Sequence, residues 1–357
     1  MNILSLFDGM SCGQQALERA GIKVDNYFAS EIDKYAIQVT MANYPNTKQL
    51  GSVVDVDGYS LPKIDILIGG SPCQSFSFAG KRKGMSTKDE QEILTLEHYL
   101  QLKAEGYEFE GQSYLFWEYM RLLNECKPKY FLLENVMMDE KWEKILSKAI
   151  GVNPIMINSS LVSAQNRKRL YWTNIGMQPM GLFGDMQSII QQPKDKGILL
   201  KDVLESAVDE KYFLSENAIK SIILNNNNLQ KSNIDPLKSN PLQSPGHACG
   251  VYKGASYTIA RLNKTIENNT LIENCLIDSY NQQIHINKSI TISTRVNASS
   301  CTHIYKNSRI RRLTPIECER LQTIADNYTN HVSDSQRYKM LGNGWTVSVV
   351  SHIFSYI

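Results

Sequence analysis

The 357-residue sequence lacks several patterns that would each indicate a particular class of protein. It has no CxxC and no HxxxH pair. Its seven cysteines are odd in number and scattered, which argues against a disulfide framework and against a structural zinc site. No apolar run reaches the length of a membrane span, and the N-terminus lacks the pattern of a signal peptide. We therefore expect a cytoplasmic monomer with no metal and no membrane partner.

An excess of charge of one sign is also lacking, because the formal net charge is only +2. A sum this small does not indicate a nucleic-acid partner. Basic residues are nevertheless concentrated in three short clusters, at 81–83, 167–169 and 309–312. Phosphate binding depends on local charge density, so these clusters are candidate nucleic-acid contacts, and a solvated face is the alternative for each.

The sequence does contain a regular alternation of strand and helix patterns. This alternation predicts an α/β fold with a mostly parallel, doubly wound sheet and helices on both faces. The predicted strands are 2–7, 26–30, 53–54, 64–68, 130–133, 155–159 and 170–174. The predicted helices are 14–20, 34–41, 92–103, 113–126, 139–149, 314–323, 333–341 and 346–354, with a turn at 342–344.

The composition changes after Gly176. Residues 177 to about 305 are rich in Asn, Ser and Gln, with strand-like patterns at 257–261 and 291–295. Their aromatic and β-branched content argues against the alternative, a disordered insert. We therefore predict a catalytic and cofactor-binding domain over 1–176, a smaller irregular or β domain over 177–305, and helices over 306–357 that return to the first domain.

A glycine-bearing turn at 8–13 follows the first predicted strand, and an acidic residue, Glu31, ends the second. An acid about twenty residues after such a turn suits hydrogen bonding to ribose hydroxyls. Each feature alone is a weak signal, because glycine turns after strands are common. Together they favour a cofactor that carries a nucleoside.

A cysteine, Cys73, stands just beyond the buried strand 64–68, in the run GGSPCQS at 69–75. The two glycines permit a sharp turn and the close approach of a ligand, and Pro72 stiffens that turn. At the rim of an α/β sheet such a cysteine is a candidate nucleophile. A small, buried structural cysteine is the alternative.

Three predicted strand ends carry polar groups, namely Cys73, Glu134 and the run 165–169. Methylation of cytosine at carbon 5 needs such groups, because that carbon is a poor nucleophile. A thiolate that adds to carbon 6 activates carbon 5, an acid neutralises charge at ring nitrogen 3, and cations hold the carbonyl oxygen. A sulfonium methyl donor with an adenosine half would use the Gly9 turn and Glu31.

Taken in the order in which they occur along the sequence, these residues and several others resemble the motifs of the cytosine-5 DNA methyltransferase family. The motifs are FDG at 7–9, PCQ at 72–74, ENV at 134–136, QNRKR at 165–169, RLTPIECERLQ at 312–322 and GN at 342–343. Each is short, but six in the correct order are specific, and they span most of the chain outside 177–305. Residues 7–13, 162–165 and Trp345 look closer to the animal de novo branch. The GN motif and the large polar region favour a bacterial or phage enzyme.

The resemblance implies a Rossmann-like, S-adenosylmethionine-dependent DNA (cytosine-5-)-methyltransferase that extrudes its target base from the duplex. It implies that Cys73 is the nucleophile and that Glu134 contacts ring nitrogen 3 and the exocyclic amine. Arg169, with Arg167, is expected to hold oxygen 2 and the nearby phosphate. An ordinary ion pair at Glu134 and a phosphate clamp without a catalytic role at Arg167 are the alternatives.

Cofactor contacts carry over from the family to a set of residues near the predicted strand ends. They are Phe7, Asp8, Gly9, Met10, Cys12, Glu31, Ile32, Ser52, Val53, Pro72, Leu115, Asn343, Gly344 and Trp345. Core packing is the alternative for Leu115 and Trp345. Ser52 departs from the family, which usually has Asp at that position to accept from the adenine amine.

Double-stranded DNA is the expected partner, and residues 177–305 are expected to act as the target-recognition domain. The predicted DNA contacts are Gln74, Ser75, Lys81, Arg82, Lys83, Gln165, Lys253, Arg261 and Arg295. The long basic loop after Cys73 is expected to close over the flipped base. Two alternatives stay open: a tRNA cytosine-5 methyltransferase with the same pocket, and a DNA-binding protein with a silent pocket.

Overall fold

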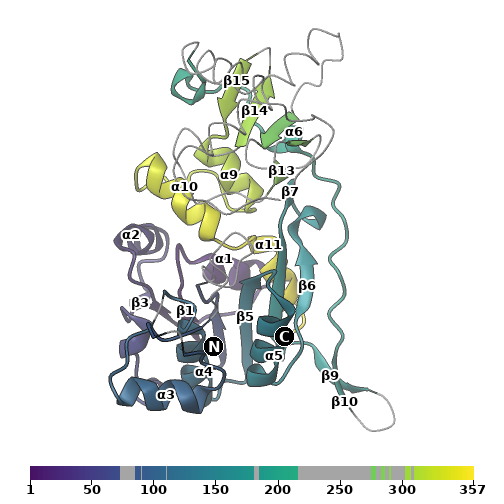
Figure 1. The fold of residues 1–357 in the computed structure, drawn as a ribbon. Coiled ribbons are helices and arrows are strands. Elements are labelled where there is room, and N and C mark those ends of the chain that lie inside the picture. The colour runs from purple at the N-terminus through teal and green to yellow at the C-terminus, as the bar shows by residue number, and fades with distance from the viewer. Residues whose placement is uncertain are drawn as a thin grey trace, which may run out of the picture.

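A seven-stranded sheet with helices on both faces lies at the centre of the computed structural model (Figure 1). The strands follow the order β3-β2-β1-β4-β5-β8-β6. Neighbours from β3 to β5 pair in parallel, and β8 runs antiparallel to β5 and β6. The mostly parallel α/β sheet predicted from the sequence is confirmed. The structure describes residues 1–72, 85–89, 91–109, 111–180, 185–215, 275–278, 283–285, 289–290, 302–306 and 309–357.

Most element boundaries lie close to those predicted from the sequence. The strands of the central sheet are β1 (Asn2–Leu6), β2 (Asn26–Ser30), β3 (Lys48–Gln49), β4 (Ile66–Gly69), β5 (Tyr130–Val136), β6 (Ile155–Asn158) and β8 (Lys168–Thr173). The main helices are α1 (Cys12–Arg19), α2 (Lys34–Asn43), α3 (Leu96–Ala104), α4 (Leu115–Cys126), α5 (Glu140–Ile150), α9 (Pro315–Leu321), α10 (Asp334–Asn343) and α11 (Val347–Phe354).

Side chains alternate between the two faces of the strands and so fill two separate cores. Ile3, Ile66 and Ile68 belong to one core, together with residues of α1 and α11. Leu4 and Leu67 belong to the other core, which residues of α3, α4 and α5 complete. Because both faces are covered, these strands are almost continuous apolar runs in the sequence.

The strand predicted at 53–54 is wrong. Val53–Asp55 form a short 3-10 helix, η1, and the strand of this region, β3, lies earlier in the chain. Ser52 caps η1, because its side chain accepts a hydrogen bond from the Val54 backbone N–H at 3.4 Å. A serine that can bond locally to the backbone favours a cap over an extended strand, and this outweighs the β propensity of two valines.

The turn predicted at 342–344 is wrong for its first two residues. Helix α10 continues through Gly342 and Asn343, and Gly344 is its C-cap residue. Side chains from other elements pair with the carbonyl groups at this helix end, as described below, and stabilise the last turn despite the glycine.

The chain after β8 adds strands outside the central sheet (Figure 1). They comprise the hairpin β9 (Met177–Met180) and β10 (Asp185–Ser188), and an antiparallel sheet of order β12-β11-β14-β15. The strands of that sheet are β11 (Cys275–Asp278), β12 (Gln283–His285), β14 (Thr302–Lys306) and β15 (Arg309–Arg312), while β13 (Ser289–Ile290) pairs in parallel with β7 (Gln165–Asn166). Short helices are η2 (Ser159–Leu161), α6 (Leu200–Val203) and η3 (Glu210–Tyr212).

The division into domains at 176 and 305 remains a proposal. The strands predicted at 257–261 and 291–295 lie outside the described residues. Within the described ranges, every helix is too short or too polar to pass through a lipid bilayer.

Candidate active site

The carboxyl ends of four adjacent parallel strands meet at one edge of the central sheet. The register pairs Leu6 of β1 with Ser30 of β2 and with Gly69 of β4, and Gly69 with Leu133 of β5. The next residue along each strand, namely Phe7, Glu31, Gly70 or Glu134, is therefore close to the corresponding residue of the neighbouring strand. Helix α1, which follows β1, and helices α3 and α4, which follow β4, pack in the two different cores and so cover opposite faces of the sheet. The point between β1 and β4 is therefore the crevice where ligands bind in open α/β sheets.

The turn after β1 has an unusual backbone conformation that several elements hold in place. Phe7, Gly9 and Ser11 have φ angles of +56°, +59° and +59°, a region that residues other than glycine seldom adopt. Thr40 of α2 donates to the Gly9 carbonyl at 3.3 Å, and Tyr328 donates to the Met10 carbonyl at 2.7 Å. Contacts from outside the turn thus stabilise a conformation that costs energy locally.

Asp8, predicted as a cofactor contact, directs its carboxylate to protein groups. Oδ1 accepts a hydrogen bond from the Tyr27 hydroxyl at 2.7 Å, and Oδ2 accepts one from the Ser11 hydroxyl. Burial raises the pKa of Asp8 to about 6, although hydrogen bonds from Ser11, Ser5 and Tyr27 act in the opposite direction. The side chain therefore joins β2 to the start of α1 beneath the turn.

Glu31 connects the turn after β1 with the start of α2. Its Oε2 accepts from the Gly9 backbone N–H at 2.8 Å, and its Oε1 accepts from Ile32 and Asp33 at 2.7 and 2.8 Å. A carboxylate accepts about four hydrogen bonds, so capacity remains for a ligand hydroxyl. The side chain of Ile32 is 71% exposed, and a Cβ added at Gly9 would meet nothing within 4 Å. These features fit a nucleoside, with the carboxylate at the sugar and an apolar side chain beside the base.

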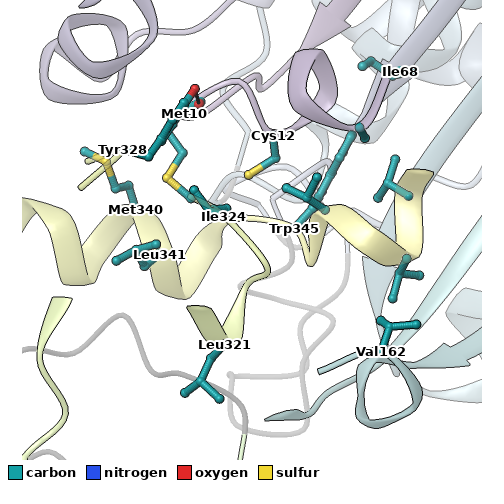
Figure 2. Close-up of a cluster of buried hydrophobic side chains, with 14 of the residues drawn as sticks. Met10, Cys12, Ile68, Val162, Leu321, Ile324, Tyr328, Met340, Leu341 and Trp345 are labelled. Carbon is teal, nitrogen blue, oxygen red and sulfur yellow. Dashed lines mark hydrogen bonds between the residues drawn. The ribbon is translucent and has the colours of Figure 1, made fainter. Parts of the chain in front are cut away.

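The other predicted cofactor residues differ in how far they are exposed to solvent. Ser52, Pro72, Leu115 and Gly344 are half-buried, and Asn343 is exposed. Met10, Cys12, Val53 and Trp345 are buried. Figure 2 shows the side chains of Met10, Cys12 and Trp345 within one hydrophobic cluster. Burial raises the pKa of the Cys12 thiol to about 12, so this cysteine is inert at neutral pH.

The turn that leads to Cys73 is fixed by a residue for which the sequence gave no separate role. The side-chain amide of Asn135 donates to the carbonyl and the hydroxyl of Ser71 at 3.3 and 3.1 Å. A Cβ added at Gly70 would lie 3.0 Å from Trp345 Nε1 and 3.2 Å from Glu134 Oε2. A side chain at this position would crowd both groups, so glycine favours the close approach. The one signal for Asn135 in the sequence was its place in the ENV motif.

Glu134 and Arg169 form an ion pair at the same edge of the sheet. Arg169 Nε lies 3.0 Å from Glu134 Oε1, and both side chains are almost entirely buried. The pair forms because β8 runs antiparallel to β5, which places Arg169 opposite Val136, two residues beyond Glu134. A second nitrogen, Arg169 Nη1, donates to the Lys168 carbonyl at 2.8 Å, so the orientation of the guanidinium is fixed.

Gln165 and Arg167 occupy different surroundings from Arg169. The guanidinium of Arg167 donates to the carbonyls of Gly342 and Gly344, at 3.3 and 3.0 Å. Gln165 is fully buried, and its amide nitrogen and oxygen have no hydrogen-bond partner in the described part of the chain. The structure therefore gives Arg167 partners at the end of α10 and pairs Arg169 with Glu134, although the sequence grouped the two arginines together.

Several predicted site residues lie outside the described residues. They are Cys73, Gln74, Ser75, Lys81, Arg82, Lys83, Lys253, Arg261 and Arg295. Over the part of the chain that is described, no group of three or more His, Cys, Asp or Glu side chains is placed to hold a metal ion.

Comparisons with known proteins agree with this geometry. A family model described as C-5 cytosine-specific DNA methylase matches residues 1–357. Orphan methyltransferase M.SPRI of Bacillus phage SPR is 28% identical, over 99% of this chain and 96% of that protein. Type II methyltransferase M1.ScrFI of Lactococcus lactis subsp. cremoris is 27% identical, over 93% and 71%. The crystal structure of a Spodoptera frugiperda DNMT2 mutant shares the fold, with a TM-score of 0.58, 17% identity and coverage of 99% and 98%.

Proposed function

The chain belongs to the C-5 cytosine-specific DNA methylase family and is a DNA cytosine-5 methyltransferase, and on that premise we propose its chemistry in detail. It transfers a methyl group from S-adenosylmethionine to carbon 5 of a cytosine that is flipped out of a specific duplex DNA sequence. The observation that carries the proposal is the Glu134–Arg169 ion pair beside the turn that leads to Cys73. The family resemblance drawn from the sequence motifs is confirmed.

In the proposed mechanism the Cys73 sulfur adds to carbon 6 of the cytosine ring. Glu134 hydrogen-bonds ring nitrogen 3 and the exocyclic amine, where charge develops as the sulfur adds. Arg169 holds Glu134 in place and faces oxygen 2 of the base. Carbon 5 then carries the electron pair that would form the new bond to the methyl carbon, while the bond from that carbon to the sulfonium sulfur would break and leave S-adenosylhomocysteine. Loss of the proton from carbon 5 and of the sulfur from carbon 6 restores the aromatic ring.

The residues that would hold the methyl donor lie at the ends of β1, β2 and α10. Glu31 is proposed to bind the ribose hydroxyls, Ile32 to cover the adenine, and Asn343 to close the site, with backbone groups of the Gly9 turn beside them. When bound, S-adenosylmethionine supplies an electrophilic methyl group. The contact that replaces the usual Asp at Ser52 is proposed to be made by Asp55, which is exposed next to it, or by a backbone carbonyl.

The DNA is proposed to contact the loop after Cys73 and the recognition region over 177–305. Gln74, Ser75 and the basic cluster 81–83 follow Cys73 in the sequence, and we propose that they close over the extruded base. Arg and Asn side chains of the recognition region suit guanine and adenine edges. The relatives come from bacteria and their phages, and we propose that this enzyme acts as a monomer in the cytoplasm of such a cell.

Bisulfite sequencing of DNA from cells that express the protein tests the proposal. We expect 5-methylcytosine at one short sequence with the native protein and none with Cys73→Ser, because a hydroxyl is a far weaker nucleophile than a thiolate. Methylation by Cys73→Ser at an undiminished rate would contradict the covalent mechanism. The same treatment of tRNA tests the second candidate substrate, since methyl groups in tRNA but not DNA would favour the tRNA enzyme. Methyl groups in neither would favour a silent pocket.

A further inference from the structure

The side chain of Arg167 donates hydrogen bonds to the chain segment at the end of α10, where the cofactor is expected to bind. It is 3% exposed, with Nη1 3.3 Å from the Gly342 carbonyl oxygen and Nη2 3.0 Å from that of Gly344. Its backbone is held as well, since its N–H donates to Asn158 Oδ1 at 3.0 Å and its carbonyl accepts from Ser159 at 2.9 Å. A guanidinium that reached cytosine would give up both bonds, and the buried Gly342 carbonyl would lose the one from Arg167, which is costly.

These carbonyls belong to the C-terminal end of α10. The last carbonyls of a helix have no partner within the helix and carry a partial negative charge, so a cation bound there is favourable. A second side chain completes this cap, because Gln322 Nε2 donates to the carbonyls of Leu341 and Gly344 at 2.7 and 3.2 Å. Arg167 and Gln322 together therefore satisfy the end of α10 from two distant parts of the chain.

The capped segment is the one predicted to close the cofactor site. Asn343, between the two carbonyls, is exposed at the end of α10. Gly344 follows, and it packs against α1, because a Cβ added there would lie 3.4 Å from the buried Cys12 sulfur; Trp345 comes next. Its indole Nε1 lies 3.0 Å from the position of a Cβ at Gly70, next to the turn that leads to Cys73. A shift of this segment would thus move groups on both sides of the crevice between β1 and β4.

We propose that Arg167 is a positioning residue for the cofactor-binding segment 343–345 and does not contact cytosine. It fixes the end of α10 and thereby sets the affinity for S-adenosylmethionine, whereas Arg169 acts on cytosine beside Glu134. The inference rests on the proposed function, because it assumes that the crevice binds this cofactor.

Two substitutions in the full-length protein separate the roles of the two arginines. Binding of S-adenosylmethionine without DNA is measured by calorimetry, and kcat and the KM for DNA are measured at saturating cofactor. We expect Arg167→Gln to weaken cofactor binding about 10- to 100-fold, the range for losing hydrogen bonds from a charged group, with most of kcat regained at saturation. We expect Arg169→Gln to keep the cofactor affinity within about twofold and to lower kcat by about 100-fold or more.

Two further variants test whether the loss of affinity comes from the cap and not from a general loss of folding. Circular dichroism checks that each variant is folded. Gln322→Leu removes the other half of the cap and should also weaken cofactor binding. Arg167→Lys keeps a cation at the helix end and should recover part of the affinity lost in Arg167→Gln. Cofactor affinities of Arg167→Gln and Gln322→Leu equal to that of the native protein would overturn the inference, as would a kcat for Arg167→Gln as low as for Arg169→Gln at saturation. A native protein that does not bind S-adenosylmethionine would instead contradict the proposed function itself.

Discussion

At the scale of single residues, Asp8 belongs to the FDG motif and also stabilises the turn after β1. Its carboxylate accepts hydrogen bonds from the hydroxyls of Ser11 and Tyr27 beneath the turn. That turn includes left-handed residues at Phe7 and Ser11, which need outside support to persist. The raised pKa of Asp8, about 6, gives this contact a dependence on pH that can be measured.

The stability of the native protein relative to Asp8→Asn should increase as the pH is lowered from 7 to 5. The folded pKa of Asp8 lies above the usual value of 3.8, so the folded state binds the proton more tightly than the unfolded state. Protonation between pH 6 and 4 therefore favours folding, and asparagine does not titrate. We expect a relative gain of about 1 kcal/mol in the free energy of unfolding, measured by urea denaturation at both pH values.

Asp25→Asn is the matched control for this prediction. The hydrogen bond from the N-terminal amino group lowers the pKa of Asp25, so this carboxylate stays ionised between pH 5 and 7. Its difference from the native protein should be the same at both pH values. A constant difference for Asp8→Asn as well would contradict the titration of Asp8 in this range.

At the scale of elements, one carboxylate joins β15 and α9. Glu317 accepts two hydrogen bonds from Arg311, at 2.7 and 2.6 Å, and also bonds the backbone N–H groups of Thr314 and Glu205 at 2.8 and 2.9 Å. Thr314 and Glu317 form a capping box at the start of α9, where the sequence predicts a helix. The helix start that returns the chain to the central sheet is thus also the anchor of a strand in the smaller sheet.

Glu317→Gln should destabilise the protein by about 3 kcal/mol or more, because it leaves the buried charge of Arg311 without a carboxylate. Both side chains are at most 2% exposed. Asp326→Asn is the matched control, because its partner, Arg320, lies on the same helix as Glu317. It removes the partner of Arg320, a pair that is 32% and 44% exposed, and should cost less than about 1 kcal/mol. Equal free energies of unfolding for the two variants, measured by urea denaturation, would contradict the role of burial.

At the scale of the whole molecule, the positions of the basic residues matter more than the net charge. The net charge of +2 gives no general attraction to DNA. The cluster Lys81, Arg82 and Lys83 follows β4 in the sequence and lies outside the described residues. Three exposed lysines, Lys23, Lys63 and Lys129, precede β2, β4 and β5 and so lie toward the edge of the sheet where these strands begin.

Neutralising Lys81, Arg82 and Lys83 to Gln should weaken the dependence of DNA affinity on salt. Each lost phosphate contact lowers the slope of log K against log salt concentration by about 0.9, so three contacts give a change of about 2 to 3. The affinity for duplex DNA is measured by titration over a range of salt concentrations. Neutralising Lys23, Lys63 and Lys129 removes the same charge and should leave the slope unchanged. If both triple variants behaved alike, net charge rather than the loop would control binding.

The sequence by itself determined the elements of this protein and its family. Strand β2 has the predicted bounds, and α9 begins next to its predicted start at Thr314, because the signals for both lie within a few neighbouring residues. The order of short motifs was enough to indicate the chemistry, because these motifs specify the residue types that the reaction needs. They do not specify which residues contact one another. The local signal was wrong at 53–54, where the capping hydrogen bond of Ser52 competes with β propensity.

Only the tertiary structure decided what individual polar side chains contact. Arg167 and Gly342 are 175 positions apart, and Asn135 and Ser71 are 64 apart. No local pattern records such pairs, because they depend on the register of β5 with β8 and on where the last helices rejoin the sheet. The sequence therefore grouped Arg167 with Arg169 by spacing, whereas the fold separates them, one at the end of α10 and one beside Glu134.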